Sequence, residues 1–255
     1  MRPVIFLASM LLVVACSDSH VQPETPVLRA SKMTYHYSDG SSYRILHYDD
    51  DQIVGITSGN GNPIDGMVET DHDLIYFNDL LMEIKPHDSR YWHFEYDYDE
   101  NGVLVESIQF QDSDLIEGHF YSYDDTGRLI ADVVWSNALG NYEPMYRHEY
   151  DYDELGNLIT HRQMIMQGEE FVLTTTVEYE DFDSKKNSSH LFLNNLYHPF
   201  VQFFVNNPRT RRVTLTNGTQ SEQQMAYEYN AQGYAVRQIL EGDDADFVFE
   251  FEEIE

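Results

Sequence analysis

The chain has 255 residues, and its 15 basic and 45 acidic side chains give a formal net charge of −30. A chain this acidic repels phosphate backbones, which argues against nucleic-acid binding. It contains one cysteine, so no disulfide can form within it and its stability must come from a hydrophobic core.

The first 16 residues have the pattern of an export signal. Arg2 precedes an apolar run, 4–15, that is too short to cross a bilayer as a helix. The run ends at Cys16, and this ending resembles the lipobox of bacterial lipoproteins, whose cysteine is acylated and becomes the N-terminus. The alternative is a secretory signal with an incidental cysteine. We expect a signal peptide over 1–16, a polar tether over 17–30 and a single β domain over 31–255.

The lipobox resemblance also implies a location. It predicts a protein anchored by lipid to the outer membrane, on the periplasmic side or at the cell surface. Ser17, rather than an acidic residue, follows Cys16 and favours the outer membrane.

The first part of the β domain contains hairpin signals. Residues 33–48 form two alternating runs around Asp39 and Gly40, a pattern typical of a β-hairpin. The stretch 58–66 (SGNGNPIDG) predicts a loop. Residues 73–84 predict a pair of strands, with a short helix as the alternative.

A motif then repeats along the chain. Tyr-x-Tyr-(Asp/Asn)-x-x-Gly occurs over 96–102, 121–127, 150–156 and 227–233, and a degenerate copy without the glycine covers 47–56. In the first copy, Asp97, Asp99, Asn101 and Gly102 match the start of an EF-hand calcium loop. Such a loop needs a bidentate Glu at position 12, which here is Ile108. It also needs an oxygen ligand at position 5, which in the third copy is Leu155. The motif therefore does not predict a calcium site.

The recurring residues of the motif have a backbone explanation. Alternation places the two tyrosines of each copy on one face of a strand. The Asp or Asn then caps a tight turn, and a glycine with positive φ closes it. Each copy predicts a β-hairpin, with turn glycines at Gly102, Gly127, Gly156 and Gly233.

The segment 188–207 is different. It is apolar without alternation and contains Pro199, so it predicts a short helix or an irregular plug over one end of the sheet. Phe247, Phe249 and Phe251 alternate along a final strand.

Together these elements predict an all-β fold. We expect an antiparallel meander of hairpins, curved or closed into a barrel-like sheet, with one short helical or irregular insertion. An integral outer-membrane barrel is the structural alternative. Acids such as Glu95 and Asp97, on the face opposite the tyrosines, favour a domain surrounded by water.

The hairpins carry two resemblances. The stretch YDDTGRL (123–129) resembles the YD repeat of Rhs-type proteins, whose repeats build β-sheet shells. The chain is also similar to Bacteroidota lipoproteins of unknown function with YD-like hairpins and a porin-like β domain. In that group a segment like VNNPRTRRVTLTNGT (205–219) precedes a hairpin like YEYNAQGYA (227–235). Four good copies without a toxin or protease module argue against a toxin-enclosing shell.

No catalytic or cofactor-binding motif is present. The 11 histidines lack metal-ligand spacing, and His119 and His148 occupy equivalent motif positions on the tyrosine face, which predicts a core role. We therefore predict no catalytic residue, no cofactor and no bound metal. Trp92 and Trp135 are candidate ligand-facing aromatics, because exposed rings stack on sugars; packing within the sheet is the alternative.

These features predict a monomeric, lipid-anchored envelope protein with a non-catalytic binding or structural role. A glycan or a peptide is the expected ligand. The alternative is a hydrolase, such as a glycosidase, that uses two of the many carboxylates. The basic cluster Arg209, Arg211 and Arg212 is expected to pair with acids of neighbouring strands or to contact an acidic partner.

The predicted anchor can be tested by changing Cys16→Ser. Without the thiol no lipid can be attached, so the protein should move from the membrane fraction to the soluble fraction on ultracentrifugation. Retention of the variant in the membrane fraction would contradict the anchor or the water-exposed domain.

Overall fold

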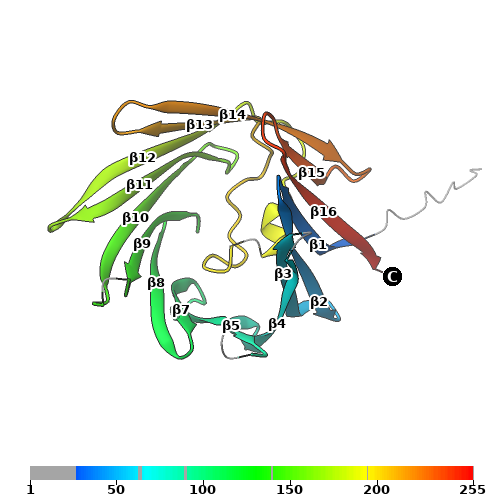
Figure 1. The fold of residues 1–255 in the computed structure, drawn as a ribbon, viewed down its shortest axis with the longest axis horizontal. Helices are drawn as coiled ribbons and strands as arrows, with labels where there is room; N and C mark the ends of the chain where they lie inside the picture. The colour runs from blue at the N-terminus through cyan, green and yellow to red at the C-terminus, as the bar shows by residue number, and fades with distance from the viewer. Residues whose placement is uncertain (1–26, 63–64, 89–90, 139, 194, 255) are drawn as a thin grey trace, which may run out of the picture.

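A computed structural model shows a sixteen-stranded antiparallel barrel (Figure 1). The structure describes residues 27–62, 65–88, 91–138, 140–193 and 195–254; the predicted signal peptide, Cys16 and most of the predicted tether lie outside them. Within these residues no helix is long and apolar enough to cross a membrane. The elements are β1 (Val27–Tyr37), β2 (Gly40–Asp49), β3 (Gln52–Asn62), β4 (Gly66–Phe77), β5 (Leu80–Pro86), β6 (Trp92–Tyr98), β7 (Leu104–Gln111), β8 (Asp114–Tyr123), β9 (Leu129–Ser136), β10 (Glu143–Tyr152), β11 (Leu158–Gln167), β12 (Glu170–Glu180), the 3-10 helix η1 (Ser189–Phe192), β13 (Thr210–Leu215), β14 (Gln220–Tyr229), β15 (Ala235–Leu240) and β16 (Ala245–Ile254).

The strands follow one another around the barrel in chain order. Each strand pairs with its sequence neighbours, and β16 pairs with β1 from Val27↔Ile254 to His36↔Asp246. This last pairing removes both edges of the sheet and satisfies their backbone groups. The predicted all-β meander is confirmed, and it is fully closed. β1 begins at Val27, inside the range expected for the tether (17–30), because Val27–Ala30 hydrogen-bond to the last strand.

The repeated motif forms the predicted hairpin turns. In the second copy the Asp124 carboxylate accepts hydrogen bonds from the backbone N–H groups of Thr126 (2.9 Å) and Arg128 (3.0 Å). The Gly127 N–H closes the turn on the Asp124 carbonyl at 3.0 Å. The same side-chain capping recurs at Asp99, Asp153 and Asn230. The motif acid thus binds backbone amides, and these bonds lower the pKa of Asp124 well below its usual value.

The four motif glycines all have positive φ, with values of 76°, 84°, 91° and 82° for Gly102, Gly127, Gly156 and Gly233. The degenerate fifth copy also forms a hairpin, β2–β3. There Asp50 takes the left-handed conformation (φ 49°) in place of a glycine. Aspartate tolerates this conformation better than most residues, because its short side chain can bond to nearby backbone.

The first third of the barrel departs from the sequence analysis at one place. Residues 33–48 form the β1–β2 hairpin and residues 73–84 form the β4–β5 strand pair, as predicted. The expected loop over 58–66 is wrong, because Ser58–Asn62 continue β3 and Gly66 begins β4. Gly59 and Gly61 lie within a continuous ladder, with partners Glu69 and Met67 on β4. Glycine fits there because a Cβ at Gly61 would lie 2.1 Å from the Gly66 carbonyl oxygen.

The motif tyrosines point into the barrel. On β6, Phe94 and Tyr96 are buried while Glu95 and Asp97 are exposed, so the two faces separate as the alternation predicts. The first tyrosine of each copy reaches the segment 181–209, which links β12 to β13. The second tyrosine bonds to a neighbouring hairpin in two copies, Tyr98 to the Leu81 carbonyl (2.8 Å) and Tyr152 to the Leu129 carbonyl (2.8 Å). In the fourth copy the second tyrosine, Tyr229, bonds to Asp183 of the segment 181–209 instead.

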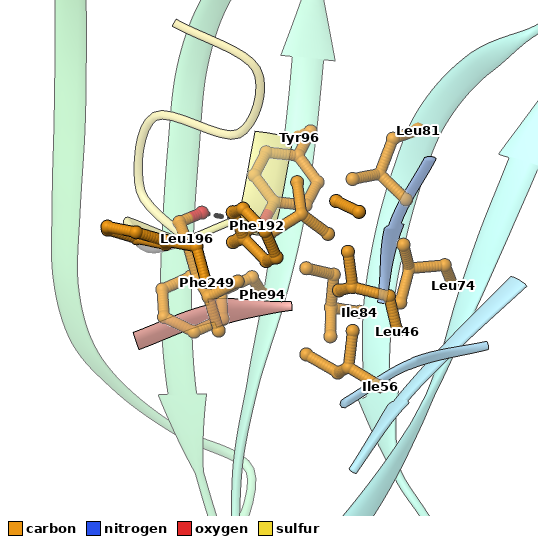
Figure 2. Close-up of a cluster of buried hydrophobic side chains, with 12 residues drawn as sticks. Leu46, Ile56, Leu74, Leu81, Ile84, Phe94, Tyr96, Phe192, Leu196 and Phe249 are labelled. Carbon is orange, nitrogen blue, oxygen red and sulfur yellow. Dashed lines mark hydrogen bonds between the residues drawn. The ribbon is translucent and has the colours of Figure 1, made fainter. Parts of the chain in front are cut away.

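The segment 181–209, apart from residue 194, is the predicted irregular insertion, and we call it the plug. It runs inside the ring of strands (Figure 1), with η1 near its start. Phe192, Leu193 and Leu196 enter a core with Leu46, Ile84 and Phe249 of the barrel wall. Figure 2 shows Phe192 and Leu196 among the wall side chains, with the Tyr96 hydroxyl bonded to the Leu196 carbonyl at 2.6 Å. The predicted plug over one end is therefore present, and part of it also enters the barrel. Asn157, beside the third motif turn, accepts hydrogen bonds from the Val205 and Asn206 N–H groups, whereas Phe192 is fully buried.

The turn glycines offer a clean stability test at Gly127. Its Cβ position is open, with no atom within 4 Å, so a substitution there changes only the backbone preference. Gly127→Val should lower the free energy of unfolding by about 1 kcal/mol or more in urea titrations, because a β-branched residue resists positive φ. Gly127→Asn is the matched control and should cost less, since Asn tolerates this conformation. Equal stability of the two variants would show that the turn does not require positive φ.

Candidate functional site

The plug occupies part of the interior of the barrel. Alternate connections of a meander lie at the same end, so the four motif turns and both ends of the plug share one end, which we call the motif end. A pocket of about 460 Å³ lies inside the barrel towards the opposite end. Its lining includes residues close to the β1–β2 and β3–β4 turns, namely Ser42, Asn60 and Val68.

A row of polar side chains crosses the wall of this pocket. Arg44 on β2 pairs with Ser58 on β3, and Ser58 pairs with Thr70 on β4, so all three side chains lie beside one another on the inner face. Arg44 Nε and Nη1 and Ser58 Oγ are buried and have no hydrogen-bond partner among the described residues. Buried donors of this kind are costly unless an acceptor reaches them. The row therefore places a cation and two hydroxyl groups in the wall of the pocket.

Arg44 is the cation of the pocket. Burial lowers the pKa of its guanidinium to about 10, so it stays charged at neutral pH. The other basic side chain nearby, His72, is 2% exposed, and burial together with the Arg44 charge lowers its pKa to about 4. His72 is therefore neutral at pH 7. None of the residues that line the pocket is an acid.

Trp92 forms part of the pocket wall. Its indole stacks on the His72 ring with centroids 4.3 Å apart and planes 19° apart, and Phe94 packs against it edge-on at 5.2 Å. Tyr91 and Met33 add further apolar surface. The pocket thus combines a half-buried cation, hydroxyl and amide groups, and an aromatic wall.

Trp135 lies on the other side of the sheet. It is opposite Gly118 and adjacent to the inward-facing Val134, so its ring is on the outer face. There it packs against Phe120 (5.9 Å) and Tyr142 (5.5 Å). The two tryptophans proposed from the sequence therefore do not share a surface, and only Trp92 lines the interior pocket.

A second cluster of polar side chains is buried where the plug contacts the barrel wall. His119 on β8, Asp132 on β9 and His198 of the plug are all buried, with Asp132 only 1% exposed. His119 Nδ1 lies 2.7 Å from Asp132 Oδ2, and its Nε2 lies 3.1 Å from Glu117 Oε1. His198 Nε2 lies 3.2 Å from Asp132 Oδ2. We call these three residues the His–Asp–His cluster.

The electrostatics of the cluster favour an ionised Asp132. Burial opposes its charge, but the hydrogen bond with His119 and the nearby His198 ring outweigh burial and lower the pKa of Asp132 to about 2. Burial alone would lower the pKa of His119, and its bonds to Asp132 and Glu117 raise it instead. Burial lowers the pKa of His198, so this ring is neutral at pH 7.

The remaining sequence candidates are placed as follows. His148 lies on β10 directly opposite Asp132 and bonds to His161 at 2.8 Å, so it faces the interior like His119. Arg212 pairs with Glu180 and Glu222 on its two neighbouring strands. A further acidic hollow, which the sequence analysis did not predict, lies at the motif end. Asp50 and Asp79 line it and take the left-handed turn positions of their hairpins.

Comparisons with known proteins bear on the fold. No protein-family model and no curated protein matches the chain. Among solved structures, a porin-like protein from Bacteroides uniformis ATCC 8492 is similar over 88% of this chain and 96% of its own, with a TM-score of 0.60 and 10% identity. A porin-like protein from Bacteroides vulgatus ATCC 8482 aligns over 89% of this chain and 100% of its own, with a TM-score of 0.45 and 11% identity. The first of these similarities shows that the two chains share a fold.

Proposed function

We propose that this protein is a lipid-anchored envelope protein whose barrel binds an acidic saccharide in the Arg44 pocket. The observation that carries the proposal is Arg44, which lines an aromatic-walled pocket that has no acid in its lining, and whose Nε and Nη1 are buried with no hydrogen-bond partner among the described residues. The proposed role is binding, without catalysis.

The charge of the chain makes Arg44 unusual. With 45 acidic side chains available, outer-face arginines such as Arg212 and Arg237 each pair with two acids. No ion pair to Arg44 is found among the described residues, although leaving a buried charge unpaired costs free energy. Binding sites keep such unpaired groups because a ligand can satisfy them. A carboxylate fits best, since the guanidinium fork can donate two parallel hydrogen bonds to it.

The rest of the pocket suits a sugar ring. Ser42, Ser58, Asn60 and Thr70 offer hydroxyl and amide groups that can bond to ring hydroxyls, and Trp92 supplies an aromatic wall. The volume of about 460 Å³ is within the range of small-ligand sites. A carboxylated monosaccharide, or the end of an acidic glycan, satisfies all these features together.

The proposed location rests on three observations. The sequence before Cys16 resembles a lipoprotein signal. The similar structure from Bacteroides uniformis is described as porin-like, which supports an envelope role. The outer face of the strands carries exposed Glu95 and Asp97 and the Arg237 ion pairs, and charges facing lipid would be costly, so the barrel is proposed to stand in water.

The hydrolase alternative requires two convergent carboxylates at the ligand. The Arg44 pocket has no acidic side chain in its lining, so a sugar bound there meets no acid–base pair. This favours binding over glycoside hydrolysis at this site.

The test is Arg44→Met, which removes the charge and keeps an unbranched side chain. Binding of N-acetylneuraminic acid or galacturonic acid, measured by calorimetry after a glycan array has identified the better ligand, should weaken at least 30-fold, or about 2 kcal/mol. The variant should also unfold at higher urea concentration than the wild type, because a buried unpaired charge has been removed.

Arg237→Met on the outer face is the matched control and should leave binding unchanged. An array with no preference for acidic over neutral glycans would contradict the proposal. So would an Arg44→Met variant that binds the acid as tightly as the wild type, or wild-type binding only to acidic peptides.

A further inference from the structure

The His–Asp–His cluster joins three parts of the chain that are distant in sequence. His119 and Asp132 come from the adjacent wall strands β8 and β9, and His198 comes from the plug inside the barrel. One ligand atom from each side chain can be chosen so that all three lie within 4.8 Å of one another. The spacing 119, 132, 198 matches no metal motif, which is why sequence analysis predicted no metal site.

Several polar atoms of the cluster have no partner. Asp132 Oδ1 and both ring nitrogens of His198 are buried without a hydrogen bond, and His198 is 6% exposed. His198 Nε2 approaches Asp132 Oδ2 to 3.2 Å, but the alignment is too poor for a hydrogen bond. A metal ion placed between these atoms would use the free lone pairs of the imidazole and the carboxylate together.

We propose that His119, Asp132 and His198 form a Zn²⁺ site that ties the plug to the barrel wall. Two imidazoles and one carboxylate are a donor set that zinc accepts, and three protein ligands leave the fourth tetrahedral position for water.

The observed distances fit this assignment after small adjustments. Zinc bonds of about 2.0 Å in tetrahedral geometry separate ligand atoms by about 3.3 Å. The His198–Asp132 distance of 3.2 Å already matches this value. The His119–Asp132 distance of 2.7 Å must lengthen, which Asp132 can allow by presenting its free Oδ1.

Glu117 can hold the His119 ring in place behind a bound metal. If His119 binds the metal through Nδ1, its Nε2–H remains bonded to Glu117 at 3.1 Å. A carboxylate behind a metal-bound histidine fixes the ring orientation and makes the ligand more basic. Glu117 is therefore a positioning residue, and it is distinct from the three ligands.

A charged hydrogen-bond network without metal is the competing explanation. In that case His119 and Asp132 form a buried ion pair, and His198 only fills space beside them. The two explanations differ over His198, because the metal site needs its lone pair and the ion pair does not. They also differ in the response of the protein to zinc.

The experiment uses the full-length chain, purified in detergent after expression with zinc in the medium. We expect one Zn²⁺ per chain by elemental analysis and a Kd tighter than about 1 µM in competition with a chromophoric chelator. Removing the zinc should lower Tm by about 5 °C or more, and adding ZnCl₂ should restore it. His198→Gln and Asp132→Asn should each lose the metal, whereas the matched control His148→Gln should keep it.

X-ray absorption of the zinc-loaded wild type keeps the test independent of variants that fail to fold. It should show an N/O shell containing two imidazoles. Absence of stoichiometric zinc, fewer than two imidazole ligands, or full zinc retention by a folded His198→Gln variant would each overturn the proposal.

Discussion

The tyrosine hydroxyls inside the barrel satisfy the irregular backbone of the plug, and the rest of the structure depends on this interaction. A peptide carbonyl in a closed interior cannot reach water, and leaving it unbonded costs about 1–3 kcal/mol. Tyr96, Tyr121 and Tyr227 donate to the carbonyls of Leu196 (2.6 Å), Tyr197 (2.6 Å) and Pro208 (2.9 Å). Each donor is the first tyrosine of a repeated motif, so the repeat supplies hydroxyl groups at regular places around the wall.

Two consequences follow from a plug held in this way. The plug takes the apolar side chains Phe192, Leu193 and Leu196 into the core, which lets so wide a barrel bury a hydrophobic interior. It also holds His198 against Asp132 and leaves the pocket beside Arg44 and Trp92 towards the opposite end. The proposed zinc site therefore depends on where the plug lies, whereas the residues that line the proposed ligand site all belong to the barrel wall and its connections.

Local features of the fold could be predicted from sequence because their causes are local. The motif acid caps its own turn through amides two and four residues later, so the pattern around Asp124 or Asn230 predicts a hairpin directly. The loop expected over 58–66 was wrong because glycine is common both in turns and in crowded strands. Only the 2.1 Å approach of a Gly61 Cβ to the facing strand distinguishes the two cases.

The sites could not be predicted in the same way. Arg44, Ser58 and Thr70 become neighbours only through strand register, and His198 meets Asp132 only after the plug enters the barrel. Trp92 and Trp135 look alike in sequence but lie on opposite faces. Arg44 could have pointed to the ligand site, because it is a basic residue within an alternating run of a highly acidic chain. Only the structure shows that its side of the strand faces inward.

Hydrogen–deuterium exchange on a Tyr96→Phe/Tyr121→Phe double variant tests the central claim most directly. The two phenol-to-carbonyl bonds are lost while the rings remain, so amides over 195–206 should exchange at least tenfold faster than in the wild type. The strands β6 to β9 should keep their protection, and Tyr152→Phe, which breaks only a bond within the wall, should leave the plug unchanged. Wild-type exchange rates in the plug of the double variant would contradict the account.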